Sequence, residues 1–315
     1  MTNALRRLAT KDATWFWRVP GPRCEDIEML NYGKTRDWKS GDVRHSYTTK
    51  DSILYALALG VGADPLDGRQ LRFIYEKELA VVPTMAAVLA SPGFWMRDRA
   101  ELGIDHLKIV HAEQGVRLHA ALPPQGTLIG RSRVVRVVDK GAGRGAILYI
   151  EKQLYDEATQ QLIATAEQAM FCRGDGGFSL AGGGDEAPTG LPPTPDRPPE
   201  AVVDLATRPD AAALYRLCGD LNPLHIDPAV AAKAGFPKPI LHGLATYGMA
   251  CRGLLELYCD YDPLRLRSIR GRLSAPVYPG ETLRVECWRE GGEVAFRVRA
   301  LERNVVVLSH GRAEV

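Results

Sequence analysis

Residues 217–244 read LCGDLNPLHIDPAVAAKAGFPKPILHGL, and the rest of the chain can be organised around this stretch. Asn222-Pro223 is a turn signal, so the chain reverses between Asp220 and His225 and both side chains can face one spot. Asp220, Asn222 and His225 could then hold a water molecule by several hydrogen bonds. An imidazole near its neutral pKa can take a proton from that water, while the carboxylate orients the ring or moves a second proton.

The same stretch ends at the start of a predicted helix. Residues 243–257, GLATYGMACRGLLEL, form one uninterrupted run long enough for about four turns. A helix N-terminus presents free backbone N–H groups and a partial positive charge, and Gly243 lets a ligand approach the backbone closely. Leu241-His242-Gly243 therefore predicts an oxyanion site at the Gly243 N–H, with His242 as a candidate for substrate binding.

Downstream of this helix the sequence predicts a three-stranded antiparallel meander. Its strands cover residues 283–289, 294–301 and 305–311, and Gly291-Gly292 is a good hairpin turn between the first two. A helix followed by such a meander is an α+β half-domain.

The first half of the chain repeats this order. Leu54-Tyr55 matches Leu214-Tyr215, and PQGTL at 124–128 matches PGETL at 279–283. The strands that follow are predicted at residues 127–138, 146–155 and 162–172. An internal repeat of this kind indicates one α+β unit built twice.

The two copies differ at the polar bend. In the repeat alignment, the positions of Asp220, Asn222 and His225 are taken in the first half by Gly60, Gly62 and Pro65. A purely structural bend should need similar residues in both copies. Each feature also has a simpler interpretation: a local turn, a solvated loop histidine, or an ordinary helix start. Their concurrence in one copy alone favours one catalytic half and one supporting half.

The copies differ in helix length as well. In the first half the helical run at residues 84–89 soon meets Ser91-Pro92-Gly93, which should end it. A shortened helix leaves volume unfilled, so we expect a cavity in or beside the first half.

Residues 175–200 are rich in Gly and Pro and are predicted to be a linker. The chain then divides into an extension of unknown role at 1–28, a degenerate first unit at 29–174, the linker, and a catalytic unit at 201–315.

Composition excludes several classes of function. The 315 residues include 40 basic and 38 acidic side chains, and this net charge of +2 indicates no nucleic-acid-binding face. No apolar run is long enough to span a membrane. The six cysteines form no C-x-x-C pair and are interpreted as reduced thiols in the cytoplasm. The histidines show no metal-ligand spacing with acidic partners, so no metal site is predicted.

The segment GDLNPLHIDPAVAAKAGFPKPILHGLATYGMA, at 219–250, closely resembles the hydratase motif of the MaoC-like (R)-specific 2-enoyl-CoA hydratases. RLSAPVYPGETLRVECWREG at 272–291 resembles the strand region that follows it in that family. DSILYALALGVGADPLDGRQLRFIYEKEL and HAEQGVRLHAALPPQGTL, in the first half, resemble the two-domain members, which include the hydratase part of peroxisomal multifunctional enzymes. The resemblance covers residues 29–315.

The resemblance implies a double hot-dog fold, in which each half is a helix packed on an antiparallel sheet. It implies that Asp220 and His225 activate water, that Asn222 supports them, and that the Gly243 N–H binds the thioester oxygen. The product would be an (R)-3-hydroxyacyl-CoA of fatty acid metabolism. No metal or redox cofactor is implied, since CoA is part of the substrate. A missing long helix in the first half implies medium, long or bulky acyl chains.

Several alternatives stay open. The CoA phosphates need cationic partners, for which Arg270, Arg272 and Lys238 are candidates by proximity in sequence.

A MaoC-type enzyme for a short branched or sterol-derived acyl-CoA would have the same bend. A hot-dog thioesterase and a non-catalytic acyl-CoA-binding protein are further alternatives. One chain supplies both halves, so a monomer is self-sufficient and a homodimer remains open.

Overall fold

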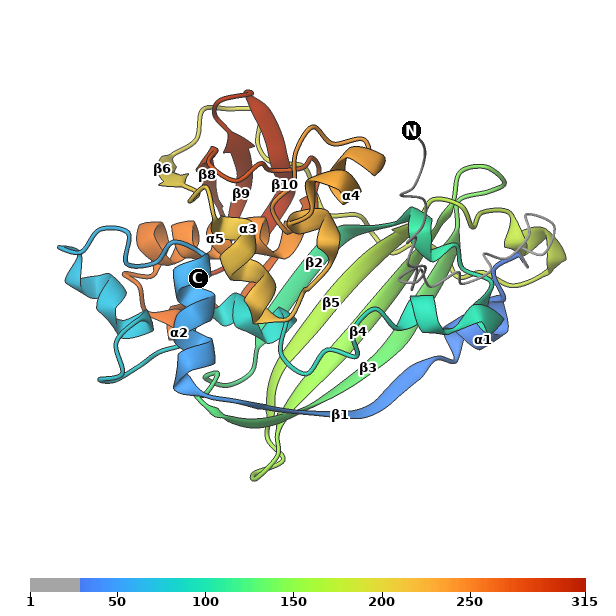
Figure 1. Ribbon diagram of the computed structural model, residues 1–315, viewed down its shortest axis with the longest axis horizontal. Coiled ribbons are helices and arrows are strands. Elements are labelled where there is room, and N and C mark those ends of the chain that lie inside the picture. The colour runs from blue at the N-terminus through green and yellow to red at the C-terminus, as the bar shows by residue number, and fades with distance from the viewer. Residues whose placement is uncertain (1–28) are drawn as a thin grey trace, which may run out of the picture.

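The computed structural model describes residues 29–315; the extension at 1–28 lies outside the described residues. It contains one ten-stranded sheet in the order β1-β3-β4-β5-β2-β7-β10-β9-β8-β6, with antiparallel pairing throughout (Figure 1). The strands are β1 Lys39–Tyr47, β2 Ile109–Leu118, β3 Gly126–Asp139, β4 Ala146–Asp156, β5 Leu162–Cys172, β6 Ala201–Ala206, β7 Ser268–Leu273, β8 Thr282–Glu290, β9 Glu293–Ala300 and β10 Val305–Glu314. The α-helices are α1 Tyr32–Arg36, α2 Thr49–Ala58, α3 Ala211–Tyr215, α4 Pro228–Lys233 and α5 Gly243–Tyr258.

The two predicted halves form the two ends of this sheet. The six predicted strands are confirmed as β3, β4, β5, β8, β9 and β10. Each half has two further strands that were not predicted, β1 and β2 in the first and β6 and β7 in the second. β2 and β7 pair with each other, so the two half-sheets are continuous. The α+β double hot-dog prediction is therefore correct, and each half is five-stranded where a three-stranded meander was expected.

The predicted helix at 243–257 is confirmed as α5, and it is the central helix of the molecule. Residues Ala245 to Leu255 are all buried, because the helix packs on the sheet of its own half and on the first half. Gly253 allows this close packing: a Cβ there would lie 2.8 Å from Cγ2 of Val285 on β8. No helix in residues 29–315 has both the length and the apolar character needed to cross a bilayer.

In the first half no long helix occupies the corresponding place. The chain makes a short 3₁₀ segment, η2 (Pro83–Ala87), and turns away at Ala90, whose φ is +47°. The break predicted at Ser91-Pro92-Gly93 is thus present and begins a few residues earlier. A cavity of about 220 Å³ adjoins Ala80 and Val81, just before this segment, and is lined mainly by apolar side chains that also include Leu118, Ala121, Leu122 and Leu264.

Three strands hold the end of η2 in place. Lys152 on β4 is 1% exposed, and its Nζ donates to the carbonyl oxygens of Ala87, at 2.9 Å, and of Leu89. The N–H of Ala90 donates to Nδ1 of His45 on β1, at 3.2 Å. On β3, a Cβ at Gly130 would lie 2.2 Å from the Ala90 oxygen, so the close approach requires glycine. These contacts with β1, β3 and β4, in addition to the local sequence, therefore end the short 3₁₀ segment.

Lys152 should make the stability of the protein depend on pH. Burial lowers the pKa of Lys152 to about 7, against an ordinary value of about 10.4. Between these values the unfolded chain binds a proton that the folded chain does not, so this residue makes stability rise with pH. The neutral amine still has hydrogens for both carbonyls. We compare the free energy of unfolding of the wild type with that of Lys152→Met. The wild-type value minus the variant value should increase by at least about 1 kcal/mol from pH 7 to 10.

Urea denaturation across that pH range measures this difference. Parallel pH profiles for the two proteins would show that Lys152 keeps an ordinary pKa in the folded state.

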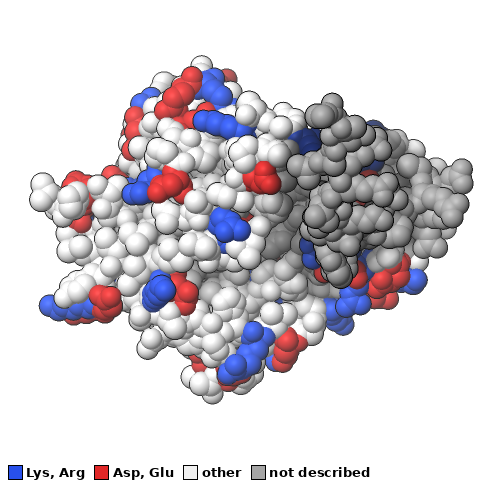
Figure 2. Space-filling model, viewed as in Figure 1, with Lys and Arg blue, Asp and Glu red and all other residues white. Residues whose placement is uncertain are grey.

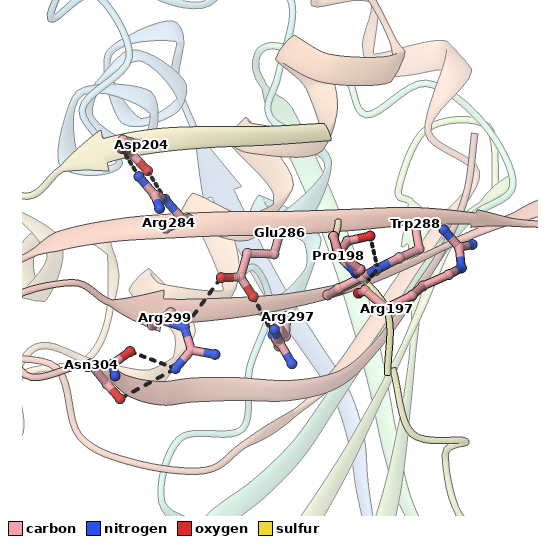
Figure 3. Close-up of polar contacts among 9 residues, drawn as sticks. All are labelled: Arg197, Pro198, Asp204, Arg284, Glu286, Trp288, Arg297, Arg299 and Asn304. Carbon is pink, nitrogen blue, oxygen red and sulfur yellow. Dashed lines mark hydrogen bonds and ion pairs between the residues drawn. The ribbon is translucent and has the colours of Figure 1, made fainter. Parts of the chain in front are cut away.

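The linker packs against the molecule more closely than expected. Phe178 in η6 (Phe178–Ala181) is 2% exposed, although this region was expected to pack almost nothing. Farther along, the Trp288 indole N–H lies within hydrogen-bonding distance of the carbonyl oxygens of Arg197 and Pro198, at 2.9 and 3.0 Å (Figure 3). The end of the linker therefore covers a fully buried tryptophan of β8.

Many charged side chains in residues 29–315 form pairs of opposite sign. On β8, Arg284 pairs with Asp204 of β6, and Glu286 pairs with both Arg297 and Arg299 of β9 (Figure 3). Figure 2 shows basic and acidic residues interspersed over the visible face, without a large patch of one sign.

Candidate active site

The predicted bend is a short 3₁₀ turn, η8 (Pro223–His225), which is shaped by local hydrogen bonds. The Asn222 side-chain oxygen accepts from the Leu224 N–H at 3.0 Å and caps the turn, and Pro223 stands at its first position. Asp220 Oδ1 accepts from the Asn222 N–H at 3.1 Å. Asn222 thus uses its oxygen for the turn and keeps its amide hydrogens for other partners.

His225 is held as a neutral ring with a free lone pair. It is 8% exposed, and its Nδ1 lies 2.9 Å from the Ile240 carbonyl oxygen. A carbonyl can only accept, so Nδ1 carries the proton and Nε2 is unprotonated. Burial lowers the pKa of His225; the Ile240 bond and the charge of Asp220 act in the opposite direction. The ring is therefore suited to accept a proton at Nε2.

His242 lies directly against His225. The two rings stack with centroids 3.7 Å apart and planes 27° apart. His242 Nε2 lies 3.1 Å from the Asp220 carbonyl oxygen, so Nε2 is the donor. The structure therefore brings together Asp220, His225 and His242, with one ligand atom of each within 4.8 Å of the others.

These three residues have ligand types and separations that could hold a metal ion, which the spacing in sequence did not predict. The nitrogens left free are Nε2 of His225 and Nδ1 of His242. An ion bound by both would have to lie near both ring planes at roughly 2 Å from each nitrogen. The ring planes of a stacked pair with centroids 3.7 Å apart and a tilt of 27° converge well beyond that distance. The stacked arrangement therefore disfavours a shared metal.

Gly243 is the first residue of α5, adjacent to this cluster. Its N–H makes no hydrogen bond among residues 29–315, as expected for the first turn of a helix. A Cβ at this position would lie 2.7 Å from Cδ1 of Leu273 on β7. The first position of the helix therefore leaves a free donor beside the bend, and glycine avoids a clash with Leu273 there, which is the arrangement predicted for an oxyanion site.

One neighbour of the site was missed by sequence reasoning. His111, on β2 of the supporting half, is close enough to Asp220 for its pKa to respond to the carboxylate charge. Burial lowers the pKa of His111 to about 4, partly opposed by the hydrogen bond of Nε2 to the Glu113 carbonyl and by Asp220. The sequence offered no signal for this contact, because β2 itself was not predicted.

Two of the three cationic candidates do not face the bend. Along β7, Ile269 is buried and Leu273 lies against Gly243, so Arg270 and Arg272 point to the other face of the sheet. Arg272 there forms an ion pair with Glu113, at 2.7 Å. These two arginines therefore do not join the residues of the bend, because neighbouring strand residues alternate between faces, and their assignment to the CoA phosphates stays a prediction.

Lys238 differs from the two arginines. It is exposed in the loop that leads to His242, and its Nζ lies 5.4 Å from the centre of the Tyr278 ring. It remains a candidate for contacts with an anionic ligand.

Both halves of the chain match known families. Residues 191–310 match the model described as MaoC like domain, and residues 45–174 match the MFE-2 hydratase 2 N-terminal domain. The enoyl-CoA hydratase ChsH3 of Mycobacterium tuberculosis is 38% identical over 271 residues, which cover 85% of this chain and 92% of that protein.

A second relative is much longer than this chain. The peroxisomal multifunctional enzyme type 2 of Mus musculus is 38% identical over 275 residues; these cover 86% of this chain and only 36% of the mouse enzyme. Among solved structures, a MaoC-like dehydratase from Phytophthora capsici has a TM-score of 0.77 at 31% identity, covering 90% of this chain and 98% of that one.

Proposed function

The chain belongs to the MaoC-like enoyl-CoA hydratase family, and from this we propose that it adds water to a trans-2-enoyl-CoA to give the (R)-3-hydroxyacyl-CoA, and catalyses the reverse dehydration. The observation that supports this best is the pairing of a neutral imidazole with a carboxylate beside a free backbone donor. His225 presents the lone pair of Nε2, a carboxylate oxygen of Asp220 lies within 4.8 Å of a ring nitrogen of His225, and the Gly243 N–H is free.

The mechanism follows from these groups. Asp220 and the Asn222 amide hold a water molecule, and His225 Nε2 takes one of its protons as the water oxygen bonds to C3. The electron pair of the C2–C3 double bond moves toward the thioester, and the Gly243 N–H stabilises the negative charge on the carbonyl oxygen. The proton held by His225 is then returned to C2 on the same face. All atoms of one water molecule are accounted for without a change in oxidation state of the protein.

No cofactor enters this scheme. Hydration transfers no electrons, and the stacked His225 and His242 rings disfavour a metal between them. We propose that CoA is bound only as part of the substrate, with Lys238 among the groups that meet its phosphates.

We propose medium, long or bulky acyl chains as substrates. The support is the short η2 segment and the largely apolar cavity of about 220 Å³ that adjoins the residues just before it. We expect a higher kcat/KM for trans-2-decenoyl-CoA than for trans-2-butenoyl-CoA. Loss of the conjugated enoyl-thioester absorbance measures both values. Ala121→Trp, which fills part of the cavity, should lower the decenoyl value about tenfold or more while sparing butenoyl.

The matched control is Ala158→Trp in the exposed turn between β4 and β5, where both values should be unchanged. A preference for the butenoyl substrate would favour a short-chain or branched-chain enzyme. Release of free CoA thiol, in place of a hydrated product, would identify a thioesterase. Binding without either reaction would identify an acyl-CoA-binding protein.

The compartment and the assembly are also proposals. The five described cysteines are all free, which supports the reducing cytoplasm; the mouse relative is named as peroxisomal, so cell fractionation must decide. One chain contributes both halves of the continuous sheet, which supports a self-sufficient monomer. Light scattering on the purified protein distinguishes it from a homodimer.

A further inference from the structure

We propose that His242 is a positioning residue, which holds the ring of His225 and the main chain of Asp220 in their reactive arrangement without touching the reacting atoms. This inference rests on the proposed hydratase function. It replaces the sequence-based expectation that His242 binds substrate, since the side chain is 1% exposed.

Three contacts place His242 between the parts of the site. One face of its ring stacks on His225 with centroids 3.7 Å apart, and Tyr215 lies 5.0 Å from it at an angle of 45°. Its Nε2–H donates to the Asp220 carbonyl oxygen at 3.1 Å. Its own backbone immediately precedes the Gly243 N–H at the start of α5. One residue therefore links the base, the main chain of Asp220 and the oxyanion donor.

The hydrogen-bond pattern fixes His242 as a neutral ring. Because Nε2 donates to a carbonyl, the proton is on Nε2, and Nδ1 is buried without a partner among the described residues. Burial and the neighbouring His225 lower the pKa of His242 to about 4, with Arg216 acting in the same direction and Asp220 opposing it. A neutral His242 adds no charge beside His225 at neutral pH.

Two distinct effects follow from this placement. The stacked ring keeps water from one face of His225 and fixes its plane, so Nε2 points in one direction. The hydrogen bond to Asp220 ties the bend to the N-terminus of α5, across 22 residues of sequence. That bond sets the separation between the proton acceptor and the Gly243 donor. A misplacement of about 1 Å in such an arrangement can cost a hundredfold in rate.

Two substitutions separate these effects. His242→Gln keeps an amide donor for Asp220 but removes the ring; His242→Phe keeps a ring against His225 but removes the donor. We expect kcat on trans-2-decenoyl-CoA to fall by about tenfold to a hundredfold in each, with KM within about twofold of the wild type. In the Gln variant alone, the acid limb of the kcat/KM profile should move toward the ordinary imidazole pKa of about 6.5.

His106→Gln, in η5 (His106–Lys108), is the matched control and should change none of these quantities. A raised KM with unchanged kcat would overturn the proposal in favour of substrate binding. Losses of kcat that merely match the loss of folded protein, together with an unshifted kcat/KM pH profile in the Gln variant, would also overturn it.

A readout without substrate separates this proposal from the hydratase assignment. NMR titration of labelled histidine should show a higher pKa for His225 in His242→Gln than in the wild type. If the wild type hydrates no enoyl-CoA but this shift is seen, the proposed reaction is wrong and the positioning contact stands. If the wild type is active and no shift is seen, the positioning role is wrong.

Discussion

Asp220→Asn and His225→Ala should each lower kcat on an enoyl-CoA by about 10²- to 10⁴-fold while leaving the fold intact. The amide in the Asn variant can still accept the Asn222 N–H bond, so the turn should survive, but the negative charge that holds water and stabilises a protonated His225 is gone. His225→Ala removes the Nε2 lone pair that takes the proton. Enoyl-thioester absorbance measures the rate, and circular dichroism measures the fold.

Asp227→Asn provides a matched control close to the bend. Asp227 caps α4 by accepting the Ala229 N–H at 2.8 Å, and asparagine is an equally good cap. This variant should retain nearly full activity. The double variant of Asp220 and His225 should lose little more than either single variant, because the two groups act on one water molecule. Substantial turnover in a folded single variant would exclude the assigned mechanism.

The strands that could be predicted are those with apolar alternation and a clear turn. β8 and β9 flank Gly291-Gly292 and carry apolar residues at alternating positions, so their positions follow from local sequence. β7, SIRGRL, has only two apolar side chains, and β2, IVHAEQGVRL, mixes five apolar residues with charged ones; the charges pair across the junction, as Arg272 does with Glu113. Their identity as strands depends on each other, which no local pattern shows. For the same reason, the sequence could not show that Arg270 and Arg272 face away from the bend.

The site likewise has a part that the sequence could predict and a part that it could not. The turn at Asn222-Pro223 and its hydrogen bonds involve residues close in sequence, so their type and spacing predict the geometry. The stacking of His242 on His225 depends on how α5 meets the bend, and the approach of His111 depends on the pairing of the two halves. Sequence could name His242 as part of the site because it precedes a helix, but it could not show which way the ring faces.

Gly243→Pro should lower kcat by about 10²- to 10³-fold relative to Gly243→Ala, because it removes the backbone donor to the thioester oxygen. Proline is favoured at the first position of a helix. His242 has φ −58° and ψ 136°, a conformation that a residue before proline adopts readily. The helix should therefore form in the proline variant.

The alanine variant controls for the added side chain. Both variants place a Cβ against Leu273 Cδ1, so their difference isolates the N–H and the proline ring. Binding of a saturated acyl-CoA, measured by calorimetry, should be similar in the two, since the donor acts mainly on the charge that develops during reaction. Equal kcat values in the two variants would show that the thioester oxygen is stabilised by another group. A proline variant that binds no acyl-CoA would show steric exclusion in place of a lost donor.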